Sequence, residues 1–202
     1  FGGRIMGKWS SVCLQIFLQT KIIIKGRENI INDEKFFIAC SHQSMFETFY
    51  LQTIFNSPIF ILKYELIKIP IFGWYLKKIG SLSVNRNKIS KDNVGLIDKI
   101  KNSVKNSNRP LIIFPQGTRV LPNEIVPFKK GVGRIYDELK INCQPVAINS
   151  GNVWTKNGRL FLNKTITISI LPIVGPGMAP AEFTNYIEGK IYKELKLSLI
   201  HI

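Results

Sequence analysis

Short apolar runs alternate with helix-type segments along most of this chain of 202 residues. Apolar runs of this kind are typical of strands, whereas apolar residues at steps of three and four are typical of helices. This alternation favours the α/β class, as a single domain with a mixed, largely parallel sheet flanked by helices. We predict helices at 41–51, 91–105, 131–139 and 182–199, and strands at 22–24, 36–40, 59–62, 81–84, 111–114, 145–148 and 165–171.

The first segment has the pattern of an amphipathic helix, with an apolar stripe on one face and basic residues near it. Such a helix either packs on the core of the domain or lies on an anionic lipid surface. We therefore divide the chain into this amphipathic segment, 1–24, and a main domain, 25–202. No run approaches the roughly 20 apolar residues that span a bilayer. The stripe contains Ile5, Met6, Trp9, Val12, Cys13, Ile16 and Phe17, and the basic residues are Arg4, Lys8 and Lys21.

The chain is strongly basic, with 28 lysine and arginine residues, 13 aspartate and glutamate residues and a formal net charge of +15. Nucleic acid, anionic bilayers and phosphorylated small molecules suit such a charge, although a solvated lysine-rich surface has the same composition. No helix-turn-helix, RRM or KH signature is present, which argues against nucleic acid. The three cysteines, Cys13, Cys40 and Cys143, lie far apart in apolar stretches. This favours neither a disulfide nor a zinc site and is typical of a reducing, cytosol-facing location.

The residues after the strand at 36–40 carry the first candidate for chemistry, because Glu47 follows His42 by five positions. A carboxylate that holds one imidazole nitrogen leaves the other free to act as a base near neutral pH. Five helical steps would leave the two side chains about 140° apart, so the pair requires His42 to precede the helix. The alternative is a capping box, in which Ser44 caps the helix and Glu47 is its partner. The chain has no G-x-S-x-G element, so a direct base is the simpler assignment.

The second candidate follows the strand at 111–114. Pro115 ends the strand, and Gly117 allows the backbone to approach a ligand closely. Thr118 and Arg119 offer donors that suit a phosphate group. Cations after other segments would strengthen such a site if they converge on it, although any one of them could equally be a surface residue. These cations are Lys63, Arg86, Lys129 and Lys130.

Four blocks, taken together in this order and at these intervals, resemble the glycerolipid acyltransferase family, in particular its bacterial-type 1-acyl-glycerol-3-phosphate acyltransferases. The first block is similar to the stretch from His42 to Glu47. The other three are similar to residues 80–86, 114–119 and 144–148. Four ordered blocks are far more specific than any one of them.

The resemblance implies acyl transfer from acyl-CoA or acyl carrier protein to the free hydroxyl of 1-acyl-glycerol 3-phosphate, giving phosphatidate, at the cytoplasmic face of the cell membrane. His42 would be the base and Glu47 its partner, with no metal or other cofactor. Transfer to glycerol 3-phosphate or another lysophospholipid, or a noncatalytic basic membrane-binding member, are the alternatives. The residues implied to bind the substrate are Lys63, Arg86, Gln116, Gly117, Thr118 and Arg119.

The chain departs from the family pattern at three positions. Glu47 stands where the family usually has Asp, which keeps the charge but adds a methylene group. Gln116 replaces a Glu, and Asn85 stands where an acid often precedes the arginine. We expect the loss of two negative charges to make the phosphate pocket more positive without inactivating it.

Overall fold

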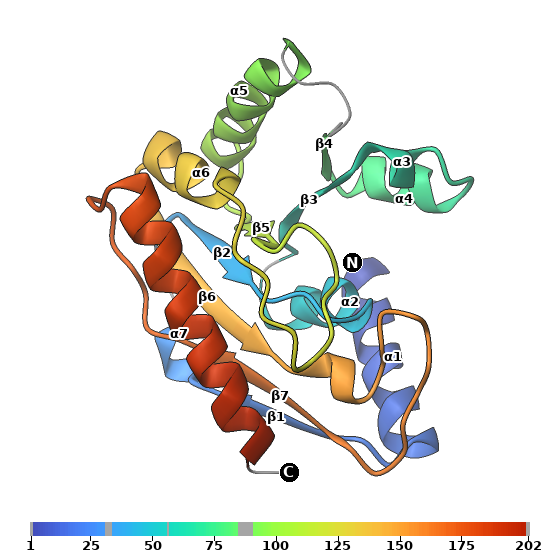
Figure 1. Ribbon diagram of the computed structural model, residues 1–202. Helices are drawn as coiled ribbons and strands as arrows, with labels where there is room; N and C mark the ends of the chain where they lie inside the picture. The colour runs from blue at the N-terminus through green and yellow to red at the C-terminus, as the bar shows by residue number, and fades with distance from the viewer. Residues whose placement is uncertain (1, 31–33, 56, 85–90, 201–202) are drawn as a thin grey trace.

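The computed structural model describes residues 2–30, 34–55, 57–84 and 91–200 (Figure 1). Its helices are α1 (Gly2–Phe17), α2 (Phe46–Ile54), α3 (Tyr64–Ile67), α4 (Phe72–Lys78), α5 (Lys91–Lys105), α6 (Gly131–Leu139) and α7 (Pro180–Ile200), with 3-10 turns η1 (Arg27–Asn29) and η2 (Ser150–Asn152). Its strands are β1 (Lys21–Lys25), β2 (Phe36–Cys40), β3 (Ile59–Lys63), β4 (Leu82–Val84), β5 (Leu111–Ile113), β6 (Asn142–Ile148) and β7 (Thr165–Ile170).

Within the described residues, the strands form one sheet in the order β1-β7-β6-β2-β5-β3-β4. Every neighbouring pair is parallel except β6 and β7, which are antiparallel. The predicted α/β class and the mixed, largely parallel sheet are therefore confirmed. Parallel strands bring their carboxyl ends to one edge of the sheet, which is where such folds build their sites.

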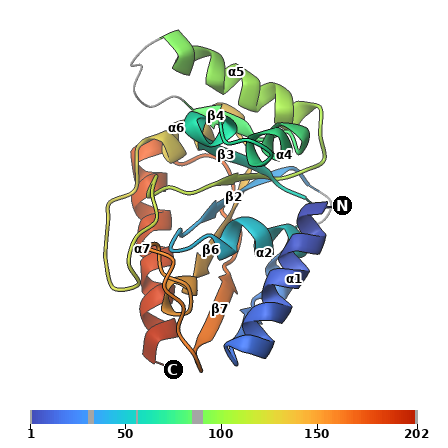
Figure 2. The same cartoon turned by 90° about the vertical axis from the view of Figure 1, so that its right-hand side faces the viewer.

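Helices cover both faces of the sheet, so the central strands are apolar on both sides. All five residues of β2 are buried. Because successive side chains point to opposite faces, Phe37 and Ala39 pack with α5, α6 and α7, whereas Ile38 and Cys40 pack with α1 and α2. Figure 2 shows α7 and α1 on opposite sides of the sheet. The continuous apolar run in the sequence reflects this burial on both faces.

Helix α1 packs on α2, but not through its apolar stripe. Its buried residues are Gly3, Gly7 and Leu14. A Cβ atom at Gly7 would lie 2.4 Å from the Phe49 carbonyl oxygen, so glycine permits the close approach of the two helices. The predicted apolar stripe faces outward: Trp9 and Ile16 are both 66% exposed. No helix among the described segments is long and apolar enough to cross a bilayer.

Most element boundaries lie within a few residues of those predicted. The helix predicted to begin at residue 41 begins at Phe46, because residues 41–45 form a loop. Two further helices, α3 and α4, lie between β3 and β4, where no helix was predicted. Strand β6 begins at Asn142, three residues before the predicted start.

Candidate active site

The predicted site residues come together at the carboxyl-terminal edge of the sheet. His42 follows β2, Lys63 is the last residue of β3, and the 114–119 segment follows β5. These three strands are parallel neighbours, which explains why segments far apart in the sequence meet. Arg86, which follows β4, lies outside the described residues.

The loop that carries His42 is bonded on both sides. The Ser41 hydroxyl accepts from the Ile148 N–H at 2.8 Å, which joins the end of β2 to the end of β6. The His42 N–H donates to Oε1 of Gln116 at 2.7 Å, and the His42 carbonyl accepts from the Val120 N–H at 2.9 Å. The Gln43 side chain accepts from the Gly151 N–H at 3.1 Å. The backbone at His42 is thus fixed by the segments after β5 and β6.

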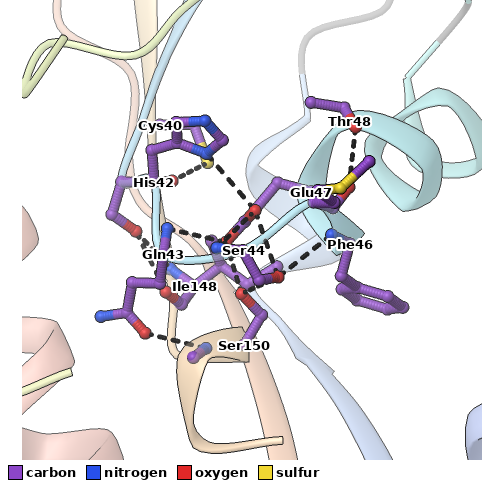
Figure 3. A network of polar contacts seen from close by, with 12 residues as sticks. Cys40, His42, Gln43, Ser44, Phe46, Glu47, Thr48, Ile148 and Ser150 are labelled. Carbon is purple, nitrogen blue, oxygen red and sulfur yellow. Dashed lines mark hydrogen bonds and ion pairs between the residues drawn. The ribbon is translucent and has the colours of Figure 1, made fainter. Parts of the chain in front are cut away.

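The Glu47 carboxylate is fully buried and lies at the centre of a polar network (Figure 3). It accepts from the Gln43 N–H at 3.0 Å and from the Ser44 N–H at 3.0 Å, and it also accepts from the Ser150 hydroxyl. The Ser44 hydroxyl donates to Ser150 Oγ at 2.9 Å. A buried carboxylate needs such donors, because burial without them is costly. These bonds also keep residues 43 and 44 out of the helix.

The His42 ring faces this carboxylate on one side and the protein interior on another. Its Nδ1 atom lies 3.4 Å from Oε2 of Glu47. This is an approach at ion-pair distance rather than a hydrogen bond of regular geometry, and Nδ1 makes no other bond to the described residues. The ring stacks on Phe114, with centroids 4.0 Å apart and planes at 18°. His42 therefore precedes α2, as the pairing requires, and is held by a carboxylate and an aromatic face.

The predicted capping box is formed only in part, because Met45 rather than Ser44 occupies the N-cap position of α2 and makes no side-chain cap bond. The Phe46 N–H donates to the Ser44 hydroxyl at 3.0 Å, and Glu47 accepts from the Ser44 backbone. Reciprocal bonds of this kind are the basis of a capping box, although here the serine bonds a residue two positions on. Glu47 both stabilises the start of α2 and faces His42, so the two sequence interpretations do not exclude each other.

A cavity of about 620 Å³ opens beside His42. Its walls come from strands β3, β4 and β5 and from helices α2 to α6, and they are mostly apolar. Its polar and charged lining residues include Lys63, Thr118, Arg119 and Lys129. Its apolar lining includes Phe60, Leu62, Leu66, Leu76, Ile79, Leu96, Ile113, Val132 and Ile135. One cavity thus combines an imidazole, cationic side chains and an apolar surface.

The residues of the second motif occupy two different places. Gly117 has φ 74°, a conformation that favours glycine, and it lines the cavity together with Thr118 and Arg119. Gln116 is only 1% exposed and does not line the cavity. Its Nε2 donates to the Tyr192 hydroxyl at 3.1 Å, while its Oε1 accepts from His42. Gln116 therefore links the histidine loop to α7.

Ser150 and Tyr192 are contacts of the site that the sequence did not indicate. Ser150 lies 103 residues from Glu47, and Tyr192 lies 76 residues from Gln116. Neither belongs to a motif, and only the sheet topology brings them close. Cys40, at the end of β2, has a pKa raised well above its usual value by burial and, secondarily, by the negative charge of Glu47. It therefore stays a protonated thiol beside the site.

The chain is similar to several known proteins. The acyltransferase family model matches residues 21–149. A 1-acyl-sn-glycerol-3-phosphate acyltransferase from Helicobacter pylori is 38% identical over 162 residues, which cover 78% of this chain and 67% of that protein. One from Pseudomonas aeruginosa is 29% identical over 155 residues, 77% of this chain and 58% of that protein. The chain thus spans little more than half of the Pseudomonas protein.

A solved structure has the same fold. The crystal structure of the 1-acyl-sn-glycerophosphate acyltransferase from Thermotoga maritima superposes with a TM-score of 0.78. The match covers 96% of this chain and 78% of that chain, at 23% sequence identity. At this identity the likeness concerns the fold alone.

Proposed function

The chain belongs to the acyltransferase family, and we propose that it transfers an acyl group from a thioester to the free hydroxyl of 1-acyl-glycerol 3-phosphate, giving phosphatidate. The observation that carries this proposal is the position of His42. Its ring, backed by the buried carboxylate of Glu47, lines the same cavity as Arg119 and Lys63. A base, a set of phosphate-binding cations and an apolar chamber are the three elements that this reaction needs.

In the proposed step, Nε2 of His42 takes the proton of the acceptor hydroxyl while the oxygen attacks the carbonyl carbon of the thioester. A C–O bond forms and gives a tetrahedral intermediate. The intermediate then collapses, the C–S bond breaks, and the thiolate leaves with the proton from the imidazolium. Glu47 offsets the positive charge that the ring carries between the two proton transfers. Both substrates bring the reacting groups, so the step needs no cofactor.

The acceptor's phosphate is assigned to the cations of the cavity. Arg119 offers a planar fork of donors that matches phosphate oxygens, and Lys63 offers a point charge from the neighbouring strand end. Thr118 adds a hydroxyl donor, and Gly117 gives the turn its shape. The family resemblance adds Arg86. The negative phosphate would thereby orient the acceptor hydroxyl toward His42.

The apolar part of the cavity is assigned to an acyl chain. Nearly the whole lining beyond the cationic side is aliphatic or aromatic, and burying an alkyl chain there is favoured by about 0.8 kcal/mol for each methylene group. The thioester carrier, coenzyme A or acyl carrier protein, would remain outside the cavity.

Substrates of this kind reside in a bilayer, so the enzyme is proposed to act at an anionic membrane surface, on its cytoplasmic face. Helix α1 supports this, because its apolar stripe faces outward while its glycine face packs on α2. The net charge of +15 attracts anionic lipid. We accordingly propose that residues 1–24 contact lipid and that residues 25–202 carry the acyltransferase chemistry.

An acyl-transfer assay tests the function. Purified protein is incubated with acyl-CoA and either lysophosphatidate or glycerol 3-phosphate, and the released thiol is measured. The assay is repeated with acylated acyl carrier protein as the donor. We expect thiol release with lysophosphatidate. His42→Ala should lower turnover by about a thousandfold, since general base catalysis contributes on this scale. His201→Ala, which changes the chain's other histidine, is the matched control and should retain full turnover.

The outcomes separate the candidate functions. Turnover with glycerol 3-phosphate alone, or with another lysophospholipid, would replace the proposed acceptor. No thiol with any acceptor and either donor would identify a noncatalytic member of the family. Full turnover by His42→Ala would remove His42 from the reaction.

A further inference from the structure

Three consecutive apolar side chains lie exposed on the loop that joins η2 to β7. Leu160 is 51% exposed, Phe161 45% and Leu162 60%. We call residues 159–164 the apolar loop. Exposed apolar residues are common singly, but a contiguous cluster indicates an interaction surface. The cluster lies apart from the cavity, because none of the three residues lines it.

The apolar loop is held in its conformation by backbone bonds. The Thr155 N–H donates to the Arg159 carbonyl at 2.9 Å, and the Phe161 N–H donates to the Val153 carbonyl at 2.9 Å. The Asn163 N–H donates to the Leu18 carbonyl at 2.9 Å. These bonds present the three apolar side chains to solvent in a fixed conformation. A partner that covers them would need little further ordering of the loop.

The charges around the apolar loop are basic. Lys156, Arg159 and Lys164 are its charged residues and neighbours, and no acidic residue occurs from 153 to 164. The Glu124 carboxylate approaches Lys156 at 4.0 Å from the segment before α6, and Arg159 and Lys164 make no ion pair with described residues. An apolar cluster flanked by basic side chains matches an anionic bilayer surface, where acyl chains lie beneath negative headgroups.

The apolar loop is bonded to the chain just after the carboxyl-terminal end of α1. The Asn163 N–H donates to the Leu18 carbonyl, and the adjacent Phe17 is 73% exposed. In Figure 1 the loop that leads into β7 passes beside this end of α1. At its other end, α1 reaches the cavity, because Gly3 lies against Gln52 and Tyr75, which both line the cavity. The helix has 16 residues, a length of about 24 Å.

We propose that the apolar loop is a second bilayer contact, which inserts Leu160, Phe161 and Leu162 into an anionic membrane beside α1. Rigid contacts at the far end of α1 fix how the helix lies on the surface, and so hold the cavity entrance at the lipid. This inference rests on the proposed function in that the acceptor is a membrane lipid. The second possible occupant, another copy of this chain, lacks the charge complementarity, because it would bring the same basic side chains together.

Flotation with lipid vesicles tests the proposal. Leu162→Asp, at the most exposed of the three positions, should partition about tenfold more weakly than the parent protein into vesicles of phosphatidylcholine and phosphatidylglycerol. Phe161→Asp should give a similar loss. Leu197→Asp is the matched control, since Leu197 is 43% exposed on α7, across the sheet, and it should float like the parent protein.

A charge variant tests the electrostatic part. Arg159→Gln should weaken binding to vesicles that contain phosphatidylglycerol by about fivefold, because each basic residue near an anionic surface contributes about 1 kcal/mol. Binding to vesicles of phosphatidylcholine alone should not change. The midpoint temperature of thermal unfolding is measured for every variant, and a midpoint equal to that of the parent protein shows that the fold is intact.

Turnover separates this inference from the proposed function. Leu162→Asp should retain full turnover of a short-chain lysophosphatidate dissolved as monomers, and lose turnover of a long-chain acceptor in vesicles in step with binding. Flotation like that of the parent protein would overturn the inference, whatever the activity. If Leu162→Asp splits a dimer in size-exclusion chromatography while flotation is unchanged, the apolar loop is a self-association surface instead. An inactive parent protein would refute the function alone.

Discussion

The side chain of Glu47 makes more contacts than either sequence interpretation requires. Its carboxylate accepts from two backbone N–H groups and the Ser150 hydroxyl, and it also faces His42. The three donors satisfy the carboxylate oxygens and so compensate for the complete burial of the side chain. Glutamate is one methylene group longer than the aspartate usual at this position, and these donors hold the carboxylate at the end of the longer side chain.

Ser150 is therefore expected to be a positioning residue that acts through Glu47. Ser150→Ala removes one hydrogen bond to a buried charge, an interaction of about 1.5–3 kcal/mol, and lets the carboxylate move relative to His42. We expect kcat to fall about tenfold. KM for the acceptor should change little, because Ser150 does not line the cavity.

A double-mutant cycle distinguishes this role from a purely structural one. In a Glu47→Gln background, Ser150→Ala should cause little further loss of kcat, because both changes act on the same interaction. Additive losses would mean that Ser150 contributes to turnover independently of Glu47. Such a result would contradict the positioning role.

Gln116 lies in a different place from the one implied by the family resemblance. We expected its neutral amide to make the phosphate pocket more positive, but its side chain is buried between His42 and Tyr192, away from the cavity. The amide suits this place because it accepts from a backbone N–H and donates to a hydroxyl. The Tyr192 hydroxyl in turn donates to the Val126 carbonyl at 2.7 Å.

Gln116→Glu should lower stability without raising activity. The new carboxylate has no proton to donate to Tyr192, so the tyrosine must turn its proton away from Val126. We expect the free energy of unfolding to fall by about 1–3 kcal/mol, as measured by urea denaturation. Turnover should change only a few-fold, because the side chain does not reach the substrate. A large rise in turnover would instead show that the native glutamine impairs the site.

Tyr192→Phe provides the matched control for this prediction. It removes the hydroxyl but adds no charge. The Gln116 amide then loses its acceptor, and the Val126 carbonyl loses its donor. Stability should fall, and adding Gln116→Glu in this background should leave a buried carboxylate oxygen without its tyrosine partner. The double variant should therefore be less stable than either single variant.

The sequence indicated the site residues that belong to local motifs. His42, Glu47 and residues 117–119 each follow a buried strand, so their place at the sheet edge could be predicted from the strands alone. Ser150 and Tyr192 could not, because each contacts the site across a large separation in sequence. Their contribution depends on β6 and α7 lying beside β2, which is a property of the topology.

At the scale of elements, the apolar pattern predicted most strands and helices well but misplaced the start of α2 by five residues. A strand buried on both faces, such as β2, is apolar throughout and easy to recognise. The start of α2 depends instead on side-chain bonds to the backbone, which compete with helix formation. The Glu47 carboxylate accepts from the N–H groups of residues 43 and 44, which lie in a loop rather than in the helix. Hydrophobic periodicity carries no information about side-chain bonds of this kind.

Helix α1 exposes its apolar stripe and buries its glycines, which is the reverse of what a hydrophobic pattern usually indicates. Apolar stripes normally face the core, and a helix that packed in this way would bury Trp9 and Ile16. Here Gly3, Gly7 and Leu14 are the buried residues of the helix, and Gly7 permits the close contact with the α2 backbone. Spacing alone could not reveal this, since small residues give no hydrophobic signal. The outward stripe is the main structural support for a lipid-facing role.

At the scale of the whole molecule, the sheet separates two kinds of surface. Helices α1 and α2 cover one face, and α5, α6 and α7 cover the other. Helix α1, with its exposed apolar residues, lies on one side of the sheet, and α7 covers the opposite face (Figure 2). The cavity is at the carboxyl edge between the layers. Lipid contact on one side therefore does not require the core to open.

The sheet itself contains two buried thiols, which should make the stability of the molecule sensitive to alkali. Burial raises the pKa of Cys143 on β6, and Cys40 on β2 is raised as well. A cysteine in an unfolded chain has a pKa of about 8.5. Above this pH the unfolded state loses protons that the folded state keeps, so the unfolded state is favoured. The free energy of unfolding should fall by about 1.4 kcal/mol per pH unit for each thiol.

Urea unfolding of parent and variant proteins measures this loss. Between about pH 8 and about pH 10, the parent protein should lose about 2 kcal/mol more stability than Cys143→Ala, which lacks one of the two thiols. Cys13→Ala is the matched control, because Cys13 is exposed on α1, and it should follow the parent protein at both values. If Cys143→Ala loses as much stability as the parent, the thiol on β6 titrates in the folded state as freely as in the unfolded chain. The strand would then have to open to solvent at alkaline pH, contrary to its complete burial in the sheet.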